Sequence, residues 1–356
     1  MHSLQAGHHP TLCKHFGMHW LMIPLLMSLI TARMHSQPIV INEIMFHPPM
    51  ERDDLQFVEL LNINDEVIEI AGWRLTGGID FTFPSGAQIQ PKAFKVIAAV
   101  PLSFTKHYQS QALGPFKKKL SHSGERIALM NDADQVIDEV TYSDEAPWPK
   151  SADGYGASLE RISPTIPVST HRNWGSSNLP PQTIASGTPS AINDSFQRTL
   201  PPEVKGVSWL PEIPRPGQTL RIEATINDDH GIQVASVAFQ TLTETGPSAE
   251  KLIPMTLQSG DELVGRYQAT LEGFSDNTLV RFQIRVQNDE SGNRFWPHPQ
   301  SLKPAFSFFV TEYQSKGLIP HVLVINPSGI ERAKRKYDIK ASILTPEPTR
   351  GNSVFI

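Results

Sequence analysis

The sequence predicts an all-β protein made of two β-sandwich domains in tandem, with a signal peptide before them and a poorly assigned C-terminal segment after them. Three observations support this fold class. Apolar and polar residues alternate with a period of two along most of the chain, as in half-buried strands. The 356 residues include 30 prolines and only 19% charged residues, a composition that suits strands and loops better than helices. The length also exceeds the usual size of one compact domain, so two domains are expected.

Residues 1–36 are predicted to form a secretory signal peptide. They include Lys14 and Arg33 but no acidic residue, and the apolar run WLMIPLLMSLI spans Trp20 to Ile30 before the small residues of TARMHS. Basic, apolar and small-residue zones in this order are typical of a signal peptide. The run is too short to cross a bilayer, which takes about 20 residues. Cleavage after Ala32 or Ser36 would fit, so we expect the mature N-terminus between Arg33 and Pro38 and a secreted or cell-surface protein with no transmembrane segment. An uncleaved anchor or a misassigned start codon is the alternative.

The cysteine content and the charge limit how the exported chain can fold and what it can bind. Cys13 is the only cysteine, and it lies before the apolar run, whereas the acylated cysteine of a lipoprotein lies after it. After cleavage no disulfide can form, so both domains must rely on their cores. The net charge of −5 becomes more negative once Lys14 and Arg33 are removed. An acidic chain is a poor general binder of nucleic acid or anionic lipid.

Residues 37–193 are predicted to form the first sandwich. Seven short stretches with period-two alternation are separated mostly by turn residues: 39–45, 56–62, 66–75, 79–83, 94–100, 125–131 and 135–142. About seven strands at this spacing are typical of two sheets packed face to face. Within the second of these stretches, FVELL (57–61) is apolar on both faces, as expected of a central strand.

The order of these pieces resembles the lamin tail domain, an immunoglobulin-like sandwich also common in exported bacterial proteins. Over about 155 residues the pieces are IVINEIMFHP, QFVELLN, IEIAGWRLTGGIDFTFPSG, ERIALMNDADQVIDEVTY, DGYGASLERI, NWG and GTPSAIN. The resemblance implies a fold with no catalytic residues. Trp73 is then expected to be a core plug between the sheets, and Gly77 and Gly78 to supply the positive φ angles of a tight hairpin.

A second sandwich is predicted for residues 203–312. Proline, serine and threonine dominate SSNLPPQTIAS, from Ser176 to Ser186, and TLPP before Glu203, and the linker is placed at 194–202. Seven strands are then expected in VKGVSWL, TLRIEATIND, VASVAFQTL, KLIPMTL, VGRYQATL, VRFQIRVQN and FSFFVTE, with one wet face and one core face. This region resembles the immunoglobulin-like or fibronectin-type modules that follow lamin tail domains in exported bacterial proteins.

Residues 313–356 are predicted to belong to neither sandwich. HVLVI (321–325) and SVFI (353–356) are strand-like and apolar, but the second sandwich already has seven strands by Glu312. Unpaired apolar edges need a cover. We expect this segment to begin a domain that the chain does not complete, and it faintly resembles the beginning of a spore-coat-H-type kinase domain.

Two acidic clusters of the second domain are candidates for a calcium site. NDDHG (227–231) follows the second strand and NDESGN (288–293) follows the sixth, so strand parity places both at one end of the sandwich. A calcium ion could then bridge the carboxylates of Asp228, Asp229, Asp289 and Glu290. Turns also require Asp, Asn and Gly, and we expect turns here and no tight calcium site. The same interpretation applies to NDAD (131–134), as a hairpin loop.

The other polar motifs show no catalytic or zinc-binding spacing. The histidines after the leader are scattered, at His47, His107, His122, His171, His230, His298 and His321. In SHSGE (121–125) a serine precedes His122, but a nucleophile needs a base supplied by the fold, so a loop before a strand is expected. The basic runs KKK (117–119) and RAKRK (332–336) are typical of solvated faces, and the second is the better candidate for an anion.

The sequence thus predicts no catalytic residue, no metal-binding residue and no cofactor. The expected function is that of a non-catalytic exported binding, adhesion or scaffold protein whose partner is a protein or polysaccharide at the cell surface. The alternative is the accessory N-terminal region of an exported multidomain enzyme, such as a spore-coat-H-type kinase or a secreted nuclease, whose catalytic domain lies downstream. A reading frame that continues beyond the Ile356 codon would favour the alternative.

Overall fold

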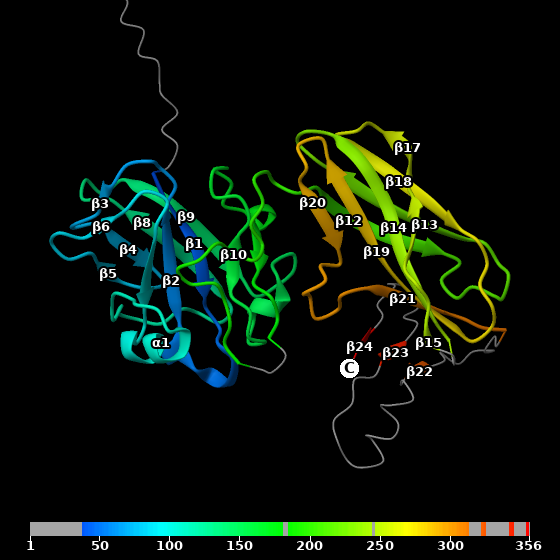
Figure 1. The fold of residues 1–356 in the computed structure, drawn as a ribbon, viewed down its shortest axis with the longest axis horizontal. Coiled ribbons are helices and arrows are strands. Elements are labelled where there is room, and N and C mark those ends of the chain that lie inside the picture. The colour runs from blue at the N-terminus through cyan, green and yellow to red at the C-terminus, as the bar shows by residue number, and fades with distance from the viewer. Residues whose placement is uncertain are drawn as a thin grey trace, which may run out of the picture. The chain divides into compact units, whose positions relative to one another are not determined.

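The fold is described from a computed structural model (Figure 1). The structure describes residues 38–180, 184–243 and 246–312, together with three short strands nearer the C-terminus. Strands dominate these ranges, which contain one α-helix, and the predicted all-β class is confirmed. Within the same ranges, no helix has the length and apolar character that crossing a membrane requires. The predicted signal peptide lies outside the described residues.

The first sandwich contains a five-stranded and a four-stranded antiparallel sheet. Their strand orders are β11-β10-β1-β2-β7 and β5-β4-β8-β9, and β3 and β6 form a separate pair. The strands are β1 (Ile39–Met45), β2 (Phe57–Asn62), β3 (Ile68–Glu69), β4 (Arg74–Gly77), β5 (Phe81–Thr82), β6 (Gln88–Ile89), β7 (Phe94–Ala98), β8 (Gly124–Met130), β9 (Val136–Ser143), β10 (Leu159–Arg161) and β11 (Trp174–Ser176). β2 pairs on both sides and is buried on both faces, which confirms its prediction as an interior strand.

Helical elements interrupt this first sandwich at a few points. The helix α1 (Pro101–Tyr108) was not predicted, because it is short and buries only Phe104. Four single turns of 3-10 helix are η1 (Pro49–Glu51), η2 (Asp53–Leu55), η3 (Lys150–Ala152) and η4 (His171–Asn173). The predicted strand at 66–75 is split into β3 and β4 by a turn.

The prediction for Trp73 was wrong. Trp73 lies in the turn before β4 and packs, partly buried, against the core. The space between the sheets is filled instead by smaller neighbours of the same stretch, among them Leu75, Ile79 and Phe83. Gly77 has a φ of 99°, as predicted, and a Cβ there would lie 2.1 Å from a backbone oxygen of β8. Gly78 has no such angle, but it packs against the carboxylate of Glu125.

The second sandwich also consists of two antiparallel sheets. One has the order β12-β13-β18-β17, and the other β15-β14-β19-β20, with β16 also paired to β14 and β21 to β19. The strands are β12 (Glu203–Leu210), β13 (Leu220–Asn227), β14 (Ile232–Thr243), β15 (Gly246–Pro247), β16 (Lys251–Pro254), β17 (Thr256–Gly260), β18 (Val264–Leu271), β19 (Thr278–Asn288), β20 (Asn293–Trp296) and β21 (Phe306–Val310). The predicted strand KLIPMTL is divided at the buried Met255, where the chain passes from one sheet to the other.

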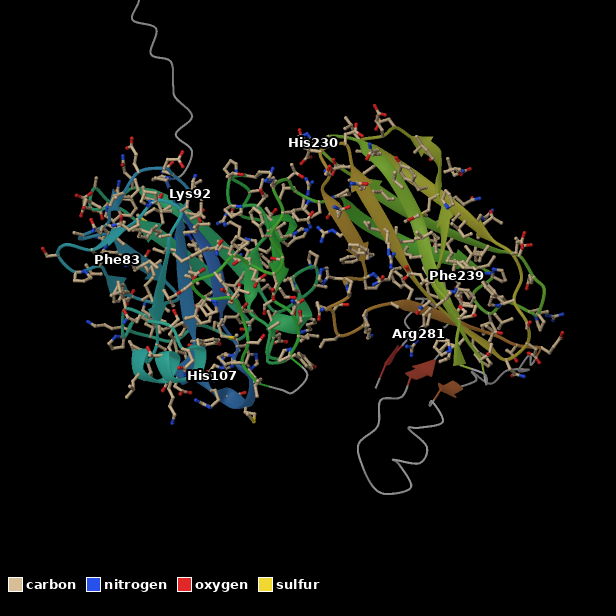
Figure 2. The ribbon with its side chains drawn as sticks, in the orientation of Figure 1. Phe83, Lys92, His107, His230, Phe239 and Arg281 are labelled. Carbon is tan, nitrogen blue, oxygen red and sulfur yellow. The ribbon has the colours of Figure 1, made fainter. Side chains whose placement is uncertain are left out.

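The core of the second sandwich follows the alternation of the sequence closely. In β13 the buried residues are Leu220, Ile222, Ala224 and Ile226, as the pattern predicts. Aromatic residues complete the core, and Figure 2 labels one of them, Phe239, on β14. Buried apolar surface is worth about 25 cal/mol per Å², so these residues dominate the stability of the domain.

Three further strands pair with one another near the C-terminus. β22 (Val322–Val324), β23 (Ser342–Leu344) and β24 (Val354–Phe355) form an antiparallel sheet of their own. The basic run 332–336 lies outside the described residues. That the segment begins a further domain stays a prediction.

Candidate functional site

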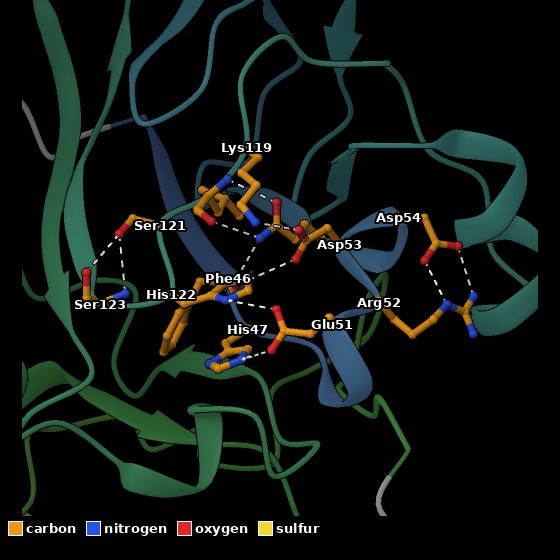
Figure 3. Close-up of polar contacts among 12 residues, drawn as sticks. Phe46, His47, Glu51, Arg52, Asp53, Asp54, Lys119, Ser121, His122 and Ser123 are labelled. Carbon is orange, nitrogen blue, oxygen red and sulfur yellow. Dashed lines mark hydrogen bonds and ion pairs between the residues drawn. The ribbon is translucent and has the colours of Figure 1, made fainter.

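Two histidines from distant parts of the sequence lie face to face in the first sandwich (Figure 3). The ring centroids of His47 and His122 are 3.8 Å apart and the ring planes differ by 7°. His47 follows the end of β1, and His122 lies in the loop before β8. The SHSGE stretch is therefore a loop before a strand, as predicted, but its histidine turns toward His47.

Gln56 holds the two segments together. It is fully buried at the start of β2, and its side-chain amide donates hydrogen bonds to the carbonyl oxygens of Phe46, at 2.7 Å, and Leu120, at 2.9 Å. Its amide oxygen also accepts from the backbone N–H of Leu120 at 3.0 Å. One side chain thus fixes the residue before His47 and the loop that contains His122.

In each histidine ring, the nitrogen that points away from Glu51, here called the outer nitrogen, lies beside an aspartate carboxylate. Nδ1 of His47 is 2.7 Å from Oδ1 of Asp153, and Nε2 of His122 is 2.8 Å from Oδ1 of Asp53. Burial would raise the pKa of Asp53, but hydrogen bonds from Lys119 and His122 lower it below its usual value. The pKa of Asp153 is likewise raised by burial and lowered, on balance, by hydrogen bonds from His47 and a lysine. Both carboxylates are therefore charged near neutral pH, and each accepts a hydrogen bond from a ring N–H.

The other nitrogen of each ring, here called the inner nitrogen, faces the carboxylate of Glu51. Nε2 of His47 and Nδ1 of His122 each lie 3.6 Å from a different oxygen of Glu51. One ligand atom from each of the three residues lies within 4.8 Å of the others. The side chain of Glu51 is 74% exposed, so water reaches this side of the cluster.

The backbone that carries Glu51 is unusual. Met50 and Glu51 have φ angles of 57° and 54°, in the left-handed region that residues other than glycine seldom adopt. Two such residues in succession cost free energy that the surrounding structure must offset. This conformation brings the Glu51 carboxylate toward the rings.

A second polar cluster is buried in the five-stranded sheet. Glu43 of β1 pairs in register with Glu160 of β10 on one side and with Glu59 of β2 on the other. All three glutamates are fully buried. Burial, followed by repulsion from the other two carboxylates, raises the pKa of Glu43 well above its usual value. Burial raises the pKa of Glu59 to about 8 and also raises that of Glu160.

The segment 187–195 covers these glutamates and binds them through its backbone. The N–H of Thr188 donates to Glu43 at 2.9 Å, and the N–H of Ser195 donates to Glu160 at 2.8 Å. The N–H of Ser190 donates to Glu59. These residues lie in and just after GTPSAIN, so that piece of the sequence closes the sheet over its own carboxylates.

The candidate calcium cluster of the second sandwich is built as turns. Asp228 is buried and accepts hydrogen bonds from the Asn288 amide, which confirms that the loops after β13 and β19 meet. Nδ1 of His230, labelled in Figure 2, is 3.5 Å from Oε1 of Glu290. Asp289 donates its backbone N–H to the carbonyl of Gly231. The absence of a tight calcium site stays a prediction.

The other candidate residues of the first sandwich form hydrogen bonds or ion pairs with residues of the same domain. NDAD is a hairpin loop between β8 and β9, as predicted, and the Asn131 side chain accepts the backbone N–H groups of residues 133 and 135. In the KKK run, Lys118 pairs with Asp80 and Lys119 with Asp53. His107 bonds the carbonyl of Ala185, and His321 lies outside the described residues.

Residues 32–144 match the family model of the Lamin Tail Domain. No curated protein matches the chain. Among solved structures, an alkylpurine DNA glycosylase of Pseudomonas fluorescens, bound to DNA containing an abasic site analog, is similar to 31% of this chain at 12% identity, with a TM-score of 0.21 over 30% of its own length. A purple acid phosphatase from yellow lupin (Lupinus luteus) seeds is similar to 76% of this chain at 10% identity, with a TM-score of 0.22 over 40% of its own length. This chain thus spans less than half of either structure, and likenesses of this size carry no inference about function.

Proposed function

We propose that the chain is an exported, non-catalytic binding protein that acts as an adhesion or scaffold module at the cell surface. A lamin tail match at residues 32–144 and an all-β fold are compatible with a module of this kind. The partner we propose is a protein or a polysaccharide. We further propose a bacterial origin, an immunoglobulin-like second domain, and export by the signal peptide at residues 1–36.

One observation carries the non-catalytic part of this proposal. Strongly shifted pKa values mark catalytic groups when those groups face a cleft. Here the carboxyls with raised pKa values include Glu43, Glu59 and Glu160, which are fully buried and bound by the backbone of residues 187–195. A substrate could reach them only by displacing that segment, so their perturbation supports a structural role.

Export and surface binding can be tested together with the full chain. Expression with the leader in a bacterial host should give a secreted or surface-bound product whose mass places its N-terminus between residues 33 and 38. Labelled mature protein should bind intact cells saturably, and protease or glycosidase treatment of the cells would identify the class of partner. A variant lacking residues 1–36 is the control, and it should stay inside the host.

The accessory-region alternative makes a different prediction for the gene. If the reading frame continues past Ile356 and its full product transfers phosphate or cleaves nucleic acid, the chain is a module of that enzyme. Failure of the processed chain to bind cells, or retention of an intact leader, would overturn the proposal for this chain.

A further inference from the structure

We propose that His47, His122 and Glu51 form a binding site for one divalent transition-metal ion, with Zn²⁺ as the preferred ion and one coordination position open to water. This site goes beyond the proposed binding function and does not depend on it. It also departs from the sequence prediction of no metal-binding residue.

The donor atoms are those that zinc takes. The site offers Nε2 of His47, Nδ1 of His122 and a carboxylate oxygen of Glu51, all within 4.8 Å of one another. Two imidazoles and one carboxylate, with a further position left for water, form a ligand set that recurs in zinc sites with three protein ligands. Bonds of about 2.1 Å in a tetrahedral arrangement place ligand atoms about 3.4 Å apart. To bind one ion, the three side chains must therefore move closer together and the two parallel rings must tilt toward the ion. Calcium and magnesium prefer oxygen ligands alone.

The outer carboxylates prepare both rings for a metal. Ligand histidines in metal sites usually donate their other ring N–H to a carboxylate or a carbonyl, which fixes the tautomer and orients the ring. Asp153 and Asp53 occupy these positions, at 2.7 and 2.8 Å from the outer nitrogens of His47 and His122. The inner nitrogen of each ring is then free to offer its lone pair, and both inner nitrogens face Glu51.

The Glu51 carboxylate has no direct hydrogen bond to either ring. Its oxygens lie 3.6 Å from Nε2 of His47 and Nδ1 of His122, which is longer than a hydrogen bond, and the two rings stack with centroids 3.8 Å apart. A divalent ion placed between the three groups would accept the lone pairs of both rings and neutralise the carboxylate.

Three features of the surrounding structure hold the segments that carry the ligand side chains. The buried Gln56 ties together the two segments that carry the histidines. A Cβ on Gly154 would lie 3.2 Å from the His47 ring, so glycine leaves room for that ring beside Asp153. The left-handed backbone at Met50 and Glu51 fixes the approach of the third ligand. Strain of this kind is often kept at ligand sites.

The test is a titration of the full chain with Zn²⁺, measured by calorimetry. The leader also contains histidines and Cys13, so the site is defined by the difference between the unchanged chain and the His47→Ala, His122→Ala double variant. We expect the double variant to lose one Zn²⁺ per chain. His230→Ala is the matched control, because His230 is also paired with a glutamate, and it should keep the full stoichiometry.

Two milder variants keep the proposal testable if the double variant fails to fold. Glu51→Gln changes an exposed side chain and should weaken Zn²⁺ binding at least 10-fold with an unchanged circular dichroism spectrum. Asp153→Asn alters a positioning residue and should weaken binding by roughly 10- to 100-fold without changing the stoichiometry. Co²⁺ bound in place of Zn²⁺ should give visible ligand-field bands that the Glu51 variant changes and the His230 control does not. Equal Zn²⁺ stoichiometry and affinity in the unchanged chain and in both the double and Glu51 variants would overturn the proposal.

Discussion

The two sandwiches have similar architectures but differ in what they bury. Among the described residues of the second sandwich, the buried polar side chains are Asp228, Thr278, Asn288 and Ser307. The first sandwich buries many more, among them Asn42, Glu43, Gln56, Glu59, Asn62, Asp138, Glu160, Arg161, Asn173 and Asn193. The charged members of this set, Glu43, Glu59, Asp138, Glu160 and Arg161, all lie in strands. The second domain is therefore held mainly by apolar packing, whereas the first also depends on a network of buried hydrogen bonds and charges.

The ion pair between Asp138 and Arg161 illustrates the difference. Both side chains are buried, with Nη2 of Arg161 2.5 Å from Oδ2 of Asp138. The same oxygen accepts the backbone N–H of Ile41, and Nε of Arg161 donates to the carbonyl of Ile41. The pair thus ties β9 and β10 to β1. In the second sandwich, Arg266 pairs with Glu223, and Arg266 is largely exposed to water.

The largest effect that we expect comes from breaking the buried pair. Asp138→Asn should lower the unfolding free energy of the first sandwich by about 3–5 kcal/mol, because Arg161 is left as an uncompensated buried charge. Urea unfolding followed by tryptophan fluorescence measures this, once Trp209 and Trp296 are replaced by Phe to silence the second sandwich.

Glu223→Gln is the matched control in the second sandwich. It removes a carboxylate that pairs with Arg221 and Arg266, two side chains exposed to water, and it should cost less than about 1 kcal/mol. Equal costs for the two variants would show that burial does not distinguish the sandwiches, and the comparison would fail.

The second effect is a dependence of stability on pH. The pKa values of Glu43, Glu59 and Glu160 are raised by burial, that of Glu59 to about 8. Between the usual glutamate pKa and about 8 the folded state therefore holds more protons than the unfolded state, and stability is lost as the pH rises. The unfolding free energy of the first sandwich should fall between pH 5 and pH 8, by at most about 1.4 kcal/mol per pH unit for each group.

Glu59→Gln sharpens this measurement. The variant removes one titrating group, so the decline of the first sandwich between pH 5 and pH 8 should become shallower, whatever the variant does to stability at pH 5. In the second sandwich burial lowers the pKa of His298, so the unfolded state holds more protons there and its unfolding free energy should rise, not fall, over the same range. An unchanged slope in the variant would contradict the role assigned to Glu59.

The sequence predicts the two sandwiches unequally for a physical reason. Where a strand has one wet face and one apolar face, as β13 does, alternation identifies both the strand and its core residues. Glu43 and Glu59 lie in strands that were predicted correctly, but a pattern rule places glutamate on the surface. Only the pairing of β1 with β2 and β10 reveals that these carboxylates meet beneath residues 187–195.

The histidine cluster could not be predicted from the sequence for the same reason, because its residues come together only in the fold. Metal sites are found in sequences by local spacing, whereas His47 and His122 are brought together by the fold through Gln56. The positions of the two histidines relative to the predicted strands did give one indication of the cluster. Both histidines lie within three residues of a predicted strand, where strand ends can meet. Trp73 shows the opposite error, since a large aromatic beside a strand was assigned to the core when it lies at the margin.

The third prediction concerns Trp73, which is partly buried at the edge of the core of the first sandwich. Trp73→Ala should cost about 1–2 kcal/mol, as a partly buried side chain leaves no closed cavity when it is removed. Phe83→Ala should cost about 3–5 kcal/mol, because Phe83 is fully buried. Thermal or urea unfolding of the two variants gives the order directly. A larger cost at Trp73 would restore the sequence prediction of a plug between the sheets.

The smallest effect is expected at the acidic end of the second sandwich, where added calcium should leave the melting temperature unchanged. An ion that bound the folded state tightly would stabilise it according to its occupancy. Here the Asp228 carboxylate is already bound by the Asn288 amide and by the backbone N–H of His230, while Glu290 faces the His230 ring. These carboxylates act as turn-forming groups. Calorimetry of the full chain with calcium and with a chelator should therefore give the same transition for this sandwich. If calcium raises the transition by several degrees, and Asp228→Asn abolishes the rise, the second sandwich also depends on polar groups, and the contrast with the first is smaller than the burial of side chains suggests.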